Sequence, residues 1–371
     1  MRLKACLLLL CGALSAVAAT DWKAQWIWMP EAETSDMMLT RKTFDLFEVP
    51  KDATLSITAG SRYELFVNGQ AVARGPARCA PHHQSFDVHT VSRFFQAGKN
   101  VIAVRVHHQP ETVSYYEASR GGLLAQIDGL DVQTDSSWRV VPDKSWNSAS
   151  QSMARFHLEV CDEVDLRNRS NHWNTAGFDD SGWADARVLK REVGWPSPQS
   201  NDRPTHLVPP WTTLVERDIP YLQECIVEAE APIYIGSIPS GGAGGTPAIP
   251  CRTAGVSPAP VAQAARLLPA NAPNECRVLI HDLGEVHTGR PYLDIEAPVG
   301  TVVEIMAAPY LLNEKILPRI VGSTYTDRIV CSGRRERWEA FYMKPTRYLA
   351  IVFRTLESEA NVYGAGVVRS D

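Results

Sequence analysis

The stretch YELFVNGQAVARGPAR, residues 63–78, largely decides how the first half of the chain is expected to fold. Its first, third and fifth residues are apolar and share one face of an extended chain, because successive side chains of a strand alternate. Asn68 and Gly69 interrupt the alternation, which then resumes. Asn-Gly between two such segments predicts a β-hairpin with a two-residue turn, since both turn positions need a positive φ. These two residues are therefore expected to serve the backbone.

Short segments of the same kind continue along the chain. Between residues 22 and 196 they are TLSITAG (54–60), NVIAVRVHH (100–108), GLLAQIDGL (122–130) and SWRVV (137–141). From residue 203 onward they are ECIVEAEAPIYIGSI (224–238), RPYLDIEAPVGTVVEIMAA (290–308), RERWEAF (335–341) and RYLAIVFRTL (347–356). Turn residues separate them, and only 309–317 has the character of a brief helical turn. We therefore predict an all-β chain of two antiparallel, jelly-roll-like β-sandwich domains, residues 20–200 and 201–371.

The second of these domains is interrupted by a segment of different composition. Residues 238–274 consist mostly of Gly, Ala, Pro, Ser and Thr, with few large apolar side chains. Such a segment buries too little surface to offset the entropy of ordering it. We predict a disordered insertion in a loop.

Residues 1–19 have the pattern of a secretory leader. A basic head with Arg2 and Lys4 precedes a short apolar core, and small residues end it near Ala18 or Ala19. Cleavage there would make the mature protein secreted or periplasmic. Elsewhere the sequence holds no run that approaches the ~18 apolar residues of a membrane span.

Charge and cysteine content exclude some classes of partner. The 371-residue chain has a net formal charge of −5 and no long run of one sign, so it lacks the basic face that nucleic acids require. Six cysteines follow the leader, and an exported protein can oxidise them, but their sequence does not fix any pairing. Cys251 and Cys276 flank a loop that a disulfide could close. A Cys-x-x-Cys pair is absent, so no metal site or cofactor is expected.

Two loop regions carry candidate ligand-binding residues. The first, 73–91, is rich in Arg, His and Pro and is interpreted as a rim loop rather than a strand. Its candidates are Arg74, Arg78, His82 and His83, which could meet the hydroxyl groups of a ligand. The alternative is an ordinary solvated loop, since loops are polar in general.

The second region, 107–122, follows a predicted core strand. Its candidates are His107, His108, Tyr115, Tyr116 and Glu117. Carbohydrate sites combine an aromatic face with a few polar groups that fix orientation, and this set offers both. The alternative is that the tyrosines simply cover the core.

Two other polar clusters are expected to be structural. In HDLGEVHTG (281–289) three side chains could share a strand face, but the glycines indicate bends and the helical spacing of metal-binding histidines is missing. Asp179 and Asp180 are adjacent, so on an extended chain they point apart and cannot act on one bond. Nucleophile-elbow, phosphate-loop and dinucleotide motifs are also absent, so no catalytic residue is assigned.

In their order, the segments resemble a known family. WKAQWIW, RKTFDL, ATLSITAGSRYELFVNGQAV and FFQAGKNVIAVRVHH, followed by SSWRV and FDDSGWADARVL, are similar to the N-terminal jelly-roll of bacterial α-L-rhamnosidases of glycoside hydrolase family 78. HDLGEVHTGRPYLDIEAPVGTVVEI and YTDRIVCSGRRERWEAFYMKPTRYLAIVF resemble the second β-domain of the same enzymes. The insertion 238–274 lies outside this resemblance.

The resemblance implies an accessory, carbohydrate-binding role. In that family the hydrolytic carboxylates lie on an (α/α)6 barrel, and no segment up to Asp371 resembles it. We therefore expect a truncated, non-catalytic portion of a rhamnosidase-like glycoside hydrolase that binds glycans, rhamnose-containing ones among them. The alternative is a hydrolase that works with a separately encoded catalytic domain or through an unrecognised site.

Overall fold

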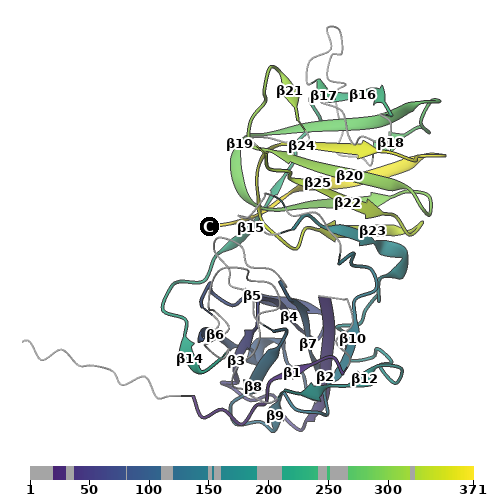
Figure 1. Ribbon diagram of the computed structural model, residues 1–371. Helices are drawn as coiled ribbons and strands as arrows, with labels where there is room; N and C mark the ends of the chain where they lie inside the picture. Colours follow the sequence, from purple (N-terminus) through teal and green to yellow (C-terminus); the bar gives the residue numbers. More distant parts are fainter. Residues whose placement is uncertain are drawn as a thin grey trace, which may run out of the picture.

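The chain folds into two β-units, one above the other in Figure 1, with the C-terminus at their junction. The computed structural model describes residues 20–30, 37–80, 82–109, 120–148, 153, 160–189, 211–240, 249–250, 266–317 and 322–371. Its helices are the short 3₁₀ turns η1 (Ser92–Phe94) and η2 (Leu166–Asn168). In these ranges none of the helices has the length or hydrophobicity needed to span a bilayer. The predicted all-β class is confirmed.

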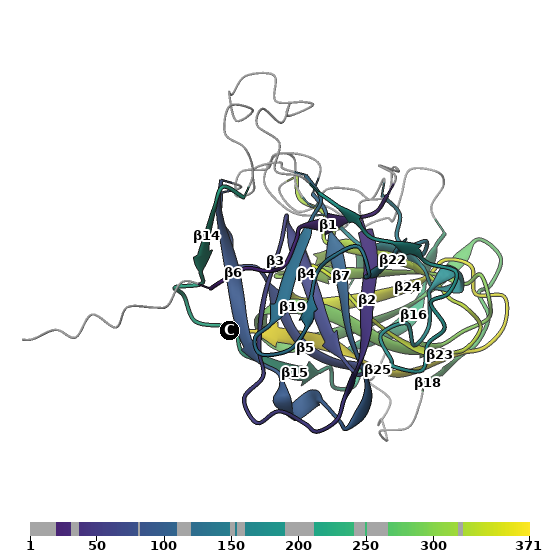
Figure 2. The ribbon, with the colours of Figure 1, turned by 90° about the horizontal axis from the view of Figure 1, so that it is seen from below.

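The first unit is a sandwich of two sheets, seen edge to edge in Figure 2. One sheet has the order β13 (Arg187–Val188), β1 (Ile27–Trp28), β8 (Leu123–Ile127), β3 (Thr54–Ala59), β6 (His83–Thr90) and β14 (Thr213–Glu216), and β9 (Val132–Gln133) pairs with β8. The other has the order β12 (Ala184–Asp185), β10 (Arg139–Pro142), β2 (Met37–Leu46), β7 (Gly98–His107), β4 (Arg62–Val67) and β5 (Gln70–Gly75).

The hairpin predicted at Asn68-Gly69 joins β4 to β5. Asn68 has a φ of 50° and Gly69 a φ of 83°, and Val67 pairs with Gln70 across the turn. Tyr63, Leu65 and Val67 are buried in the core between the sheets, as their alternation predicts. The outward Phe66 packs edge-on against Trp173.

The interpretation of 73–91 as a rim loop is wrong for most of its length. Residues 73–75 complete β5, and His83–Thr90 form β6. The polar side chains of β6 are buried because residues far away in the sequence bind them: Gln84 donates to the Ala59 carbonyl, and Asp87 accepts from Arg217. Buried polar groups are tolerated in a strand when they have such partners.

The second unit is built on one ten-stranded sheet. Its main order is β11 (Glu163–Asp165), β22 (Thr326–Val330), β20 (Val302–Ala308), β24 (Lys344–Phe353), β19 (Glu275–Glu296), β25 (Ala360–Ser370) and β15 (Glu224–Glu228). β16 (Tyr234–Pro239) and β23 (Arg335–Glu339) pair with β19, and β18 (Arg266–Leu268) pairs with β25.

The 22-residue strand β19 connects the two layers of this unit. Its first half pairs with β16 and β24, and its second half pairs with β25 and β23. The register with β24 shifts between Asp282 and His287, around Gly284 with a φ of 84°. A bulge of this kind bends a strand and lets it pass from one layer to the next.

The ends of the 238–274 insertion are strands. Ile249–Pro250 form β17, which pairs with β21 (Lys315–Ile316), and β18 lies on β25. Ile249 and Leu268 are buried. The remainder of the insertion, 241–248 and 251–265, lies outside the described residues, as does Cys251, whereas Cys276 is a free thiol. The helical turn predicted at 309–317 is wrong, because Asn313 and Glu314 form a turn with positive φ values next to β21.

The two units exchange strands. β11 leaves the first unit and pairs in parallel with β22 of the second. In return β14 follows β13 in sequence and pairs in parallel with β6 of the first. Trp211, stacked on Trp26 at 3.8 Å between ring centroids, holds the start of this returning segment. The segment 211–222 is thereby fixed to the first unit before the chain enters β15.

A buried ionic cluster holds β11 against the second unit. Lys344 Nζ lies 2.9 Å from Asp327 Oδ1, and both side chains are fully buried. Asp327 Oδ1 also accepts from the backbone N–H of Asp162, and Asp162 Oδ2 accepts from the N–H of Phe341. Burial and the charge of Asp327 raise the pKa of Asp162 to about 7. Burial lowers the pKa of Lys344, but the two carboxylates outweigh it and raise that pKa.

Asp162→Asn is expected to change the pH dependence of stability. The folded state holds the Asp162 proton up to about pH 7, whereas an unfolded Asp loses it near pH 4. Wild-type stability therefore falls as pH rises through this window, and the amide variant avoids the loss. In urea unfolding, the variant should gain on the order of 2 kcal/mol over wild type between pH 5 and 8.

The matched control is Asp165→Asn, three residues away. Its hydrogen bond from the Arg167 side chain lowers the pKa of Asp165, so this group stays ionised from pH 5 to 8. Its difference from wild type should be constant over that range. A constant difference for Asp162→Asn as well would contradict the assignment.

Candidate functional site: a cleft between the two units

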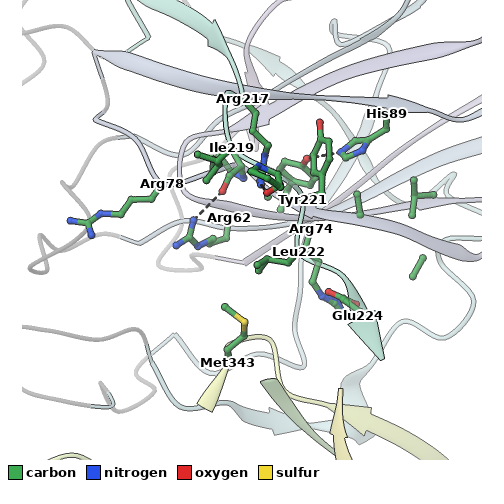
Figure 3. A pocket seen from close by; sticks show the side chains of 18 of the residues that line it. Arg62, Arg74, Arg78, His89, Arg217, Ile219, Tyr221, Leu222, Glu224 and Met343 are labelled. Carbon is green, nitrogen blue, oxygen red and sulfur yellow. Dashed lines mark hydrogen bonds between the residues drawn. The ribbon is translucent and has the colours of Figure 1, made fainter. Parts of the chain in front are cut away.

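A cleft of about 660 Å³ opens at the junction of the units. The first unit contributes β4, β5 and the residues that follow β5, and the connecting segment contributes 217–222. Arg290 and residues 341–343 line it from the second unit. In Figure 3, Met343 faces the arginines of the other wall from the side of the second unit. Because both units form its walls, the shape of the cleft depends on their relative position.

Asp87 organises the wall that the first unit supplies. Its buried carboxylate accepts from Arg217 Nε at 2.6 Å and, through its other oxygen, from the Tyr63 hydroxyl. The Tyr63 oxygen lies 3.2 Å from His89 Nε2. Since the single hydroxyl proton of Tyr63 goes to Asp87, His89 must donate its Nε2–H to Tyr63.

The pKa values in this network follow from burial. Burial, with the charge of Asp87, raises the pKa of Tyr63 well above its usual range, so the phenol stays protonated. Burial lowers the pKa of His89; Asp87 opposes this shift and Arg217 adds to it. Arg217 is therefore the one charged group facing the cleft in this network, with Asp87 behind it.

Tyr221 fixes the connecting segment over β6. Its hydroxyl donates to the Val88 carbonyl at 2.9 Å and accepts from the Val88 N–H at 2.8 Å. The Arg217 guanidinium lies 4.6 Å from the centroid of the Tyr221 ring, and the His89 ring lies 4.9 Å away. The aromatic side chain is therefore held in one place, although it remains partly exposed.

One carboxylate oxygen joins the two units at the floor of the cleft. Glu339 Oε1 lies 3.0 Å from Arg74 of the first unit and 2.9 Å from Arg290 of the second. Glu64 also binds Arg74, and Glu224 binds Arg290 at 2.7 Å. Burial lowers the pKa of Arg74, but Glu64 and Glu339 outweigh it and raise that pKa. The floor is thus a charged network in which both arginines stay protonated.

The structure brings two of the predicted binding residues to the cleft. Arg74 and Arg78 both line it. His82 and His83 are exposed at the start of β6, away from the lining, and the His82 carbonyl accepts from Thr212 and Thr213.

The predicted residues of 107–122 are separated from this group. His107 is fully buried at the junction, where Nδ1 pairs with the Tyr342 hydroxyl. His108 lies edge-on to Trp28. Tyr115, Tyr116 and Glu117 lie outside the described residues.

The sequence did not indicate most of the lining. Arg62, Arg217, Tyr221 and Arg290 belong to four separate segments that meet only in the fold. A hint was present for Arg62, since it precedes the buried face of the hairpin at the same strand end as Arg74. The other three could not be connected to the cleft without knowledge of the strand exchange.

The remaining polar clusters are structural. Asp180 pairs with the buried Arg41, and Asp179 accepts from the Ser181 N–H. His281 binds the Glu230 carbonyl and Asp282 pairs with Arg347. In the part of the chain that the structure describes, no group of three or more potential ligands could hold a metal ion.

Comparison with known families and proteins points in one direction. Residues 48–206 match the family model of the α-L-rhamnosidase N-terminal domain. A curated α-L-rhamnosidase of Formosa agariphila is 27% identical over 187 residues, which cover 44% of this chain and 20% of that protein. The chain thus spans about a fifth of the length of this relative.

Solved structures share the fold over nearly the whole chain. A GH78 family rhamnosidase of Bacillus sp. GL1 superposes with a TM-score of 0.73 at 21% identity, covering 94% of this chain and 55% of that one. An α-L-rhamnosidase of Aspergillus terreus superposes with a TM-score of 0.59 at 19% identity, covering 94% and 36%. At these identities the likeness concerns the fold.

Gly75→Ala tests the packing behind the cleft wall. A Cβ at Gly75 would overlap Asp87 Oδ2 and lie 2.7 Å from the Tyr63 hydroxyl, so both groups must move. We expect a loss of about 1–3 kcal/mol in the free energy of unfolding, measured in urea. Gly177→Ala is the control, because nothing lies within 4 Å of its added Cβ. Equal stability of the two variants would contradict the tight packing around Asp87.

Proposed function

Because residues 48–206 form an α-L-rhamnosidase N-terminal domain, we propose that this chain is the accessory, glycan-binding portion of an α-L-rhamnosidase-like glycoside hydrolase. The observation that carries the proposal is the cleft of about 660 Å³ at the junction, within the size range of small-molecule sites. Its guanidinium, phenol and imidazole groups offer hydrogen bonds to sugar oxygens. The ligand in this proposal is a glycan that contains rhamnose.

The cleft is suited to binding rather than to hydrolysis. Glycoside hydrolysis commonly needs two carboxyl groups on opposite sides of the scissile bond, about 5–10 Å apart. Among the described residues, Glu224 is the one carboxylate that lines the cleft, and it is paired with Arg290. We therefore assign hydrolysis to a separate catalytic domain, carried by the same polypeptide or by another one.

Binding is tested by calorimetric titration of the purified protein with rhamnose-containing oligosaccharides. Tyr221→Ala should weaken binding about 5–10-fold, because it releases the segment that forms one wall. Tyr310→Ala is the matched control, since Tyr310 is an exposed tyrosine outside the cleft lining and its loss should leave the affinity unchanged.

Two results would overturn the proposal. One is the absence of binding to any glycan on a broad array. The other is release of the chromophore of an aryl α-L-rhamnoside by the same preparation, persisting through repeated purification and lost in Glu224→Gln.

We also propose that the protein is exported, on the basis of the leader pattern in residues 1–19. Protein recovered from outside the cytoplasm should begin at Ala19 or Thr20, which N-terminal sequencing would establish. A chain that begins at Met1 in that fraction would contradict export by cleavage.

A further inference from the structure

The cleft is lined by an unusual number of arginines. They are Arg62, Arg74, Arg78, Arg93, Arg217 and Arg290. They come from β4, β5, the residues after β5, η1, the connecting segment and β19, so the fold gathers them from six places in the chain. Among the described residues that line the cleft, Glu224 alone carries a carboxylate. A cleft in a protein of net negative charge thus has a positive surface.

The carboxylates that contact these arginines lie behind them. Asp87 holds Arg217 and is fully buried, and Glu339 lies beneath Arg74 and Arg290. The side chains of Arg217 and Arg290 are only 9% and 3% exposed, so water screens their charges little. Such contacts orient a guanidinium in advance, which lowers the entropic cost when an anion binds.

The aromatic groups of the cleft are already in contact with other side chains. The rings of Tyr63 and Tyr342 are buried, and the Arg217 guanidinium lies 4.6 Å from the ring centroid of Tyr221. Phe341 packs against His107 and Tyr342. These rings therefore offer little free surface on which a neutral sugar could stack. The groups available to a ligand are mainly guanidinium donors.

We infer that the cleft selects an acidic saccharide, whose carboxylate or sulfate group the arginines bind. A guanidinium presents two parallel N–H donors that match the two oxygens of such a group. Arg62, half-buried beside the Pro76 carbonyl, and the exposed Arg78 lie nearest the opening and are assigned the first contacts with the anion. This inference rests on the proposed glycan-binding function and names the chemical class of its ligand.

The experiment compares three probes by calorimetric titration: an oligogalacturonate trimer, its neutral methyl ester and a sulfated oligosaccharide of similar length. At least one acidic probe should bind about ten-fold or more tightly than the methyl ester, and its affinity should fall between 0.05 and 0.5 M NaCl. Whichever acidic probe binds identifies carboxylate or sulfate as the preferred group.

Arg62→Gln and Arg78→Gln should each weaken binding of the acidic probe about 3–10-fold. Arg187→Gln removes the same charge from an exposed position on β13, outside the cleft lining, and should have no such effect. Unchanged thermal midpoints show that the variants are folded.

The outcomes separate the inference from the proposed function. If neutral glycans bind as tightly as acidic ones, the inference is wrong while glycan binding stands. If Arg187→Gln causes an equal loss, the attraction is a general charge effect and the inference is also wrong. If no probe and no glycan binds, both fail.

Discussion

The structure depends on a buried ion pair, Lys344 with Asp327, to which Asp162 is added by backbone hydrogen bonds. An ion pair of this kind contributes little to stability compared with apolar packing, but removing one partner leaves an uncompensated buried charge and is strongly destabilising. The cluster therefore restricts where β11 can lie on the edge of β22. Because β11 comes from the chain of the first unit, this local requirement fixes one unit against the other.

The cleft follows from that restriction. Its floor, where Glu339 binds Arg74 from one unit and Arg290 from the other, exists only when β5 and β19 lie at one relative position. The returning segment closes the side wall, since Trp211 stacks on Trp26 and the Tyr221 hydroxyl binds both polar groups of Val88. The site is thus a property of the junction, and neither sandwich contains it alone.

What could be predicted from the sequence is what depends on neighbours in the chain. The alternation before Asn68 and the positive φ required at Gly69 give the hairpin, and repeated short strands give the all-β class. What could not be predicted depends on distant partners. Polar residues of β6 suggested a loop because Arg217, the partner of Asp87, is 130 residues away. For the same reason the sequence pointed to Arg74 and Arg78 but not to Arg217 or Arg290.

The same physical requirement connects the buried cluster and the cleft. A carboxylate placed behind an arginine neutralises part of its charge and fixes its orientation, so the arginine can be buried at an acceptable free-energy cost. Asp87 does this for Arg217 and Glu339 does it for Arg290. At the mouth, Arg62 and Arg78 are more accessible, so an incoming ligand can reach their donors. The cleft therefore changes from internally compensated charge at its floor to accessible positive charge at its opening, which is the arrangement that an anionic group entering from solvent would meet.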